Sequence, residues 1–110
     1  SDHLKDLSKL FETVKTSVQH FLIYLTKDTL SRPWCVGEVV IAMESKLKTT
    51  KILHGSYTGL PQLETAEDVQ NYVASGVNFM DYNMTALHLI KGLKWIASPS
   101  VTTIRVRDDW

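Results

Sequence analysis

Apolar residues near the start of the chain recur at intervals of three and four positions. They are Leu4, Leu7, Leu10, Phe11, Val14 and Val18. This spacing predicts an amphipathic helix over residues 3–18 that packs through one face. The run that follows, residues 21–25 (Phe-Leu-Ile-Tyr-Leu), is continuously apolar and is bounded by polar residues. Such a run is typical of a parallel-sheet strand that is covered on both faces.

Helix and strand signals alternate along the rest of the chain. Ser31 comes shortly before Pro33, and this pair indicates a helix start, because proline is tolerated in a first turn and serine can accept a free backbone N–H. Helices are predicted over residues 33–46, 65–74 and 84–98, and strands over residues 50–54, 77–80 and 101–106. With right-handed crossovers, this order predicts an α/β, flavodoxin-like fold: a mostly parallel sheet with helices on both faces.

Length and composition fit one globular domain spanning residues 1–110. The chain has 110 residues, 44% hydrophobic and 22% charged, which excludes a disordered or low-complexity protein. Twelve Lys and Arg balance twelve Asp and Glu, so we expect no nucleic-acid partner. No apolar run approaches the roughly 20 residues of a membrane span. The single cysteine, Cys35, indicates an intracellular, reducing compartment, with cytoplasm and organelle left open.

Several enzyme classes lack their required residues. The sequence contains no GxGxxG, GxxxxGK[ST], HExxH, CxxC or GxSxG motif. The four histidines are scattered at His3, His20, His54 and His88, and we expect surface or capping roles for them, with no metal site. Cys35 has no histidine at helical spacing to activate it, so a packing role is expected rather than a nucleophilic one.

One stretch is more specific. The strand at residues 21–25 is followed by a short polar loop and then by Ser31, Trp34, Cys35 and Glu38, which open the next predicted helix. This stretch resembles the third strand and following helix of Toll/interleukin receptor (TIR) domains, whose pattern ends in Ser-x-Trp-Cys-x-x-Glu. The spacing from Trp34 to Glu38 agrees with that pattern, and the resemblance covers about residues 4–62. It implies that Glu38 is the catalytic residue if the chain hydrolyses NAD, as some members of the family do.

The chain departs from the family at its start. It begins where the family's second helix would begin, so we expect the family's first strand, first helix and second strand to be missing, and with them one wall of the nucleotide cleft. Gly37 stands where a bulkier residue is often found and weakens the helix by about 0.5–1 kcal/mol. Glu38 has a simpler interpretation as a carboxylate that complements the helix dipole near the N-terminal end.

These observations favour a TIR-like protein-interaction module, non-catalytic and without a cofactor, that serves as an accessory subunit of a larger assembly. The alternative is a TIR-type NAD⁺ glycohydrolase that uses Glu38, with the missing wall supplied by a partner or a longer parent chain. Under the first interpretation residues 21–25 form an exposed sheet edge, which places Phe21, Ile23 and Leu25 at the interface with a protein partner. Trp34 is expected to be largely buried and to anchor the helix start.

Overall fold

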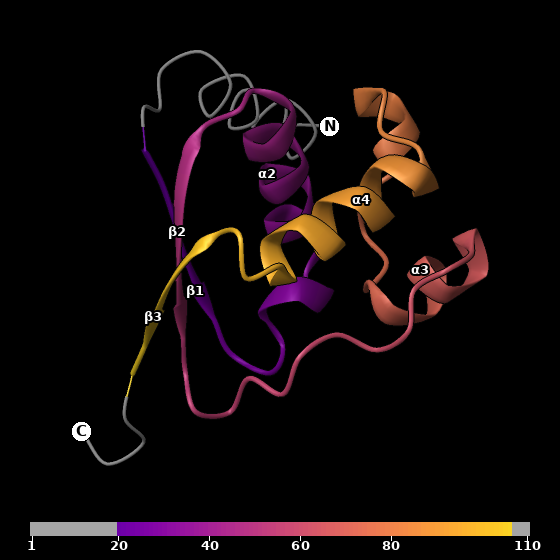
Figure 1. Cartoon of the computed structure of the whole chain (residues 1–110). Helices are drawn as coiled ribbons and strands as arrows, with labels where there is room; N and C mark the ends of the chain where they lie inside the picture. The colour runs from indigo at the N-terminus through magenta and orange to yellow at the C-terminus, as the bar shows by residue number, and fades with distance from the viewer. Residues whose placement is uncertain (1–19, 107–110) are drawn as a thin grey trace.

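The computed structural model describes residues 20–106, so the helix expected over residues 3–18 lies outside the described residues. The described elements are β1 (His20–Leu25), η1 (Thr29–Ser31), α2 (Pro33–Glu44), β2 (Lys48–Leu53), α3 (Ala66–Tyr72), η2 (Phe79–Tyr82), α4 (Ala86–Ala97) and β3 (Thr102–Arg105). The strands form one parallel sheet in the order β1-β2-β3 (Figure 1). The predicted α/β class with a parallel sheet is therefore confirmed, and the arrangement is consistent with a flavodoxin-like fold.

The described helices α2, α3 and α4 lie on one side of the sheet (Figure 1). The expectation of helices on both faces also involves the helix expected over residues 3–18, which lies outside the described residues. The strands are neighbours in sequence order, so successive right-handed crossovers turn to the same side. Burial alternates along β1 accordingly. Phe21, Ile23 and Leu25 are buried toward the helices, whereas Leu22 and Tyr24 are 63% and 44% exposed on the other face. Of the two faces of β1, the described helices therefore cover only the one that carries Phe21, Ile23 and Leu25.

The core lies between the helix side of the sheet and the two longer helices. Val36, Val39 and Val40 of α2 are fully buried, and their spacing of three and four residues places them on one face of the helix. Leu93 and Ile96 of α4 are also fully buried. α2 and α4 contact each other, and their buried residues belong to the same hydrophobic core as those of β1 and β2.

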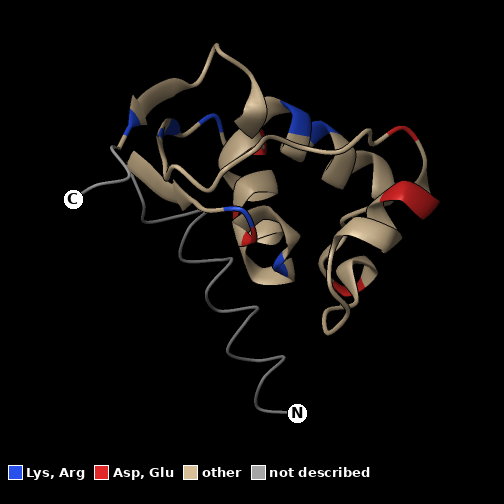
Figure 2. Ribbon diagram, turned by 90° about the horizontal axis from the view of Figure 1, so that it is seen from below, with Lys and Arg blue, Asp and Glu red and all other residues tan. Residues whose placement is uncertain are grey.

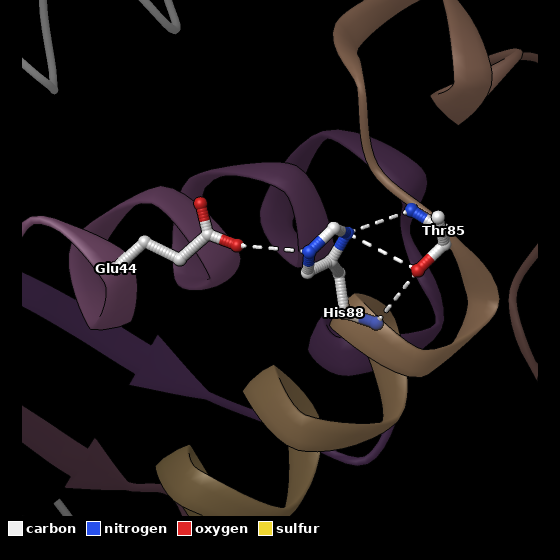
Figure 3. A network of polar contacts seen from close by, with 3 residues as sticks. All are labelled: Glu44, Thr85 and His88. Carbon is white, nitrogen blue, oxygen red and sulfur yellow. Dashed lines mark hydrogen bonds and ion pairs between the residues drawn. The ribbon is translucent and has the colours of Figure 1, made fainter.

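A polar network connects the start of α4 to the end of α2 (Figure 3). Thr85 Oγ1 accepts a hydrogen bond from His88 N at 3.3 Å, and His88 Nδ1 accepts one from Thr85 N at 2.9 Å. Since Nδ1 is the acceptor, the hydrogen of the neutral ring is assigned to Nε2, which lies 3.6 Å from Glu44 Oε1. His88 therefore has the capping role expected of a histidine in this chain.

The strand predicted over residues 77–80 does not form. This stretch runs into the 3₁₀ turn η2, where Asn78 Oδ1 accepts from Met80 N at 3.2 Å and Met84 N donates to Phe79 O at 3.0 Å. These local bonds use backbone groups that a sheet ladder would need. Asn83 then ends the turn in the left-handed conformation with φ 60°, which asparagine tolerates. The segment connects α3 to α4 away from the sheet (Figure 1).

Candidate functional site

A buried threonine shapes the loop between β1 and α2. Thr29 Oγ1 donates to Tyr24 O at 3.1 Å and accepts from Thr26 N at 2.8 Å, so one hydroxyl satisfies a carbonyl and an N–H left over where β1 ends. Leu30, the next residue, is buried in the core. The hydrogen bonds of Thr29 and the burial of Leu30 together fix the path of the chain from β1 to the segment that carries the TIR-like motif.

Ser31 does not cap α2 as the sequence suggested. Its hydroxyl donates to Asp28 O at 2.8 Å, and its carbonyl accepts from Ala74 N at 2.8 Å. The N-cap residue of α2 is Arg32, which makes no side-chain capping bond, while Pro33 occupies the first turn as predicted. Ser31 instead ties the loop to the segment that follows α3.

Trp34 is not the buried anchor that the motif suggested, because 46% of its surface is exposed. The buried stripe of α2 begins at Val36, and two positions along a helix are about 200° apart around its axis. Trp34 therefore points away from the core. Glu38 and Ala42 follow Trp34 at four-residue steps, and this flank passes from the exposed indole through the half-buried Glu38 to the fully buried Ala42.

Glu38 and Cys35 lie near each other on the first turns of α2. Burial raises the pKa of the half-buried Glu38 carboxyl. Burial, and then the Glu38 carboxylate, raise the pKa of the Cys35 thiol, while the Arg32 guanidinium acts in the opposite direction. A thiol kept protonated is a poor nucleophile, which supports a packing role for Cys35. Neither ion pair within residues 20–106 includes Glu38.

The residues expected at the interface divide between two faces of β1. The side chains of Phe21, Ile23 and Leu25 point into the core. These residues can therefore contact a partner only through their backbone atoms. Leu22 and Tyr24 carry the exposed side chains of the same strand. Sequence reasoning missed this division because a continuously apolar run has no polar position to mark the open face.

Charged side chains are unevenly placed despite the zero net charge. In Figure 2, Lys and Arg positions are found around the sheet and on α4, whereas the side of α3 carries Asp and Glu. Two of these cations, Lys51 of β2 and Arg105 of β3, line a hollow of about 710 Å³ on the helix side of the sheet. Lys51 was not singled out in the sequence, although it alternates with Thr49 and Leu53 on the face that turns inward.

A second hollow, of about 350 Å³, lies between α3, η2 and α4. Its lining is mostly apolar and includes Val69, Val73, Phe79 and Leu89. Glu38 lines neither this hollow nor the one at Lys51. Within the described chain, no three His, Cys, Asp or Glu side chains are grouped as metal ligands would be.

No helix among residues 20–106 has the length and apolar character needed to cross a membrane. Comparison with known proteins found no match to the chain, whether among family models, curated proteins or solved structures. The likeness to TIR domains therefore rests on the sequence motif that includes Trp34, Cys35 and Glu38.

Proposed function

We propose that this chain is a TIR-like protein-interaction module, without a cofactor, that takes up a β-strand of a partner protein along the outer edge of β1. The observation that carries the proposal is the exposure of Leu22 and Tyr24 on the face of the sheet that no described helix covers. Ile104 of β3 is 51% exposed, and the pairing of β3 with β2 places it on the same face. Burying apolar surface of this kind stabilises an interface by about 25 cal/mol per Å² before the costs of association.

The backbone of β1 offers the hydrogen bonds that a partner strand needs. Leu25 O accepts from His54 N at 2.9 Å, so Leu25 and the alternate residues before it turn their backbone groups toward β2. Leu22 and Tyr24 therefore turn theirs toward the outer edge. Thr29 occupies the Tyr24 carbonyl, which leaves the N–H and C=O of Leu22 and the N–H of Tyr24 without a strand partner among residues 20–106.

The sequence of β1 lacks the features that keep natural edge strands apart. Residues 20–25 contain no Lys, Arg, Asp, Glu or Pro. Natural edges that stay single are commonly blunted by lysine, proline or a bulge. An apolar edge strand whose outer backbone groups have no strand partner in the described part of the chain suits strand addition. In that mode of binding, backbone hydrogen bonds provide affinity and alternate side chains provide specificity.

A site-specific crosslinking experiment tests this proposal. A photoreactive residue replaces Leu22 in one variant and the exposed Leu87 of α4 in a matched control, and both are crosslinked in native extract. We expect one discrete protein adduct at position 22 that disappears when Tyr24→Lys is added, together with slowed amide exchange at Leu22 and Tyr24 in the native particle. A monomeric chain with fast exchange along β1, or equal adducts at both positions, would contradict the proposal.

The alternative function is NAD⁺ hydrolysis by Glu38. What favours it is the burial that raises the pKa of this carboxyl, together with the motif that surrounds it. A carboxylate so placed could stabilise the oxocarbenium-like transition state of glycosidic cleavage. The test is incubation of the purified chain with NAD⁺ and chromatographic detection of nicotinamide, for which we expect no product. Turnover that is lost in Glu38→Gln, with folding intact, would favour the enzyme over the interaction module.

A further inference from the structure

The hollow at Lys51 and Arg105 lies where open parallel sheets commonly bind ligands. It is at the carboxyl ends of β2 and β3, between the helix side of these strands, the loop that contains Tyr57, and the segment around Pro99 that follows α4. Ligands of open α/β sheets are usually found outside the carboxyl ends of the strands. The volume of about 710 Å³ is within the usual range for small-molecule sites.

Among residues 20–106, the side chains that line this hollow carry positive charge and include no carboxylate. Lys51 is only 4% exposed, and its Nζ donates to Ile96 O and Ser98 O, both at 2.8 Å, at the end of α4. Arg105 lines the same hollow from the neighbouring strand. Neither residue takes part in an ion pair between residues 20 and 106, and none of the described residues that line the hollow is Asp or Glu. Burial, and then the Arg105 guanidinium, lower the pKa of Lys51.

Hydrogen-bond donors remain for a ligand after the internal bonds are counted. An ammonium group has three N–H donors, and two of those on Lys51 are used by α4, which leaves one. Arg105 has a planar fork of donors that matches phosphate oxygens. Burial raises the pKa of Tyr57, so its hydroxyl stays protonated and can also donate. The partial negative charge at the end of α4 is about half a unit and cannot balance two full cations.

We propose that this hollow binds a small organic phosphate, with the phosphoryl group held between Lys51 and Arg105. A dianionic phosphoryl group balances the charge of the two cations and accepts hydrogen bonds from their remaining N–H donors. Such charge-assisted hydrogen bonds are stronger than hydrogen bonds between neutral groups. The apolar side chains of Leu53 and Leu60, which also line the hollow, would contact the organic part. The bonds to the end of α4 account for Lys51, but they do not account for Arg105, which lines the same hollow and has no ion-pair partner within residues 20–106. The site lies across the sheet from the open face of β1 and does not depend on the proposed function.

Phenyl phosphate, inorganic phosphate and benzoate are suitable probes, titrated separately into the full chain and followed by backbone amide shifts. We expect saturable binding of phenyl phosphate, with shifts in residues 51–60 and 101–106, and weaker binding of inorganic phosphate because it lacks an apolar part. Benzoate should bind at least about tenfold more weakly, a difference of about 1.4 kcal/mol. Equal binding of benzoate and phenyl phosphate would overturn the choice of a phosphoryl group.

Arg105→Gln is the decisive variant, and Lys48→Gln is its matched control. Lys48 is exposed on β2, three residues before Lys51, and its side chain falls on the opposite face of the strand. We expect Arg105→Gln to weaken phenyl phosphate binding by about tenfold or more and Lys48→Gln to change it by less than about twofold. Lys51→Met removes the two hydrogen bonds to the end of α4 and could therefore prevent folding. Arg105 is exposed, so its substitution tests binding with less effect on folding. An absence of saturable binding, or equal losses in the two Gln variants, would overturn the site.

Discussion

Gly92 of α4 lies so close to Val40 of α2 that a Cβ atom built on it would be 2.8 Å from Val40 Cγ2 and 3.4 Å from Val40 Cα. Val40 is fully buried, and a β-branched side chain in a helix has essentially one χ1 rotamer, so the methyl group cannot turn away. Glycine is used here for a close approach of two helices, although it lowers helix stability in itself. The crossing of α2 and α4 depends on this missing side chain.

We expect Gly92→Ala to destabilise the protein by about 1–3 kcal/mol, since overpacking of a tight contact outweighs the helix propensity that alanine gains. Urea denaturation measures the change in the free energy of unfolding. The control is the same substitution in a Val40→Ala background, where the methyl group that clashes is absent. The cost of Gly92→Ala should fall there by about 1 kcal/mol or more, and equal costs in the two backgrounds would show that the contact is not responsible.

The capping box of α3 predicts an acid-dependent loss of stability. Asp68 Oδ2 accepts from Glu64 N at 2.8 Å and from Thr65 N at 3.0 Å, and these backbone donors lower the pKa of the carboxyl. The folded-state pKa is then below the unfolded value of about 3.9. The stabilisation is therefore fully present above the unfolded pKa and is lost as pH falls through the folded pKa.

Asp68→Asn should make this acid-dependent part of the stability disappear. The measurement is a series of urea melts from pH 7 to about pH 2, compared between wild type and variant. Glu67→Gln is the control, because Glu67 is also in the first turn of α3 but is not part of the capping box. Identical pH dependence in wild type and Asp68→Asn would mean that the box is not formed in solution.

The hydroxyl of Thr29 should contribute measurably to stability. Thr29→Val keeps the shape of the side chain but leaves Tyr24 O and Thr26 N without that partner, so we expect a loss of about 1–3 kcal/mol in the free energy of unfolding. Thr29→Ser keeps the hydroxyl and should recover most of the loss. Thr58→Val, at an exposed loop position, should change stability by less than about 0.5 kcal/mol. A neutral Thr29→Val would show that water satisfies the two backbone groups.

Trp34→Ala should cost roughly 1–2 kcal/mol, well below the 3–5 kcal/mol of a fully buried tryptophan, because about half of the indole already faces water. Leu93→Ala on α4 is the reference, since Leu93 is fully buried and its truncation should cost about 2–5 kcal/mol. Denaturant melts of the two variants give the comparison. A loss at Trp34 as large as that at Leu93 would mean that the indole is covered in solution.

Local patterns were sufficient for most of the elements. The apolar run at residues 21–25 lies in β1, and the helix predicted over residues 33–46 ends within two residues of the observed end of α2. β2, α3, α4 and β3 also lie close to their predicted positions. These predictions succeed because apolar spacing and turn chemistry act within one element. The parallel pairing followed from the alternation of strands and helices, since a crossover helix between two strands brings them together in the same direction.

Contacts between distant segments decided the rest. Val77 and Phe79 alternate as strand residues would, but the bonds of Asn78 and the packing between α3 and α4 hold them in a turn. Trp34 is apolar enough for a core, yet the phase of α2 is set by its fully buried valines. Lys51 and Arg105 line the same hollow because β2 and β3 are paired side by side in the sheet. The alternation of apolar and polar residues within one strand does not show which other strand pairs with it. The open face of β1 depends on strand order, which determines the side of the sheet that each crossover covers.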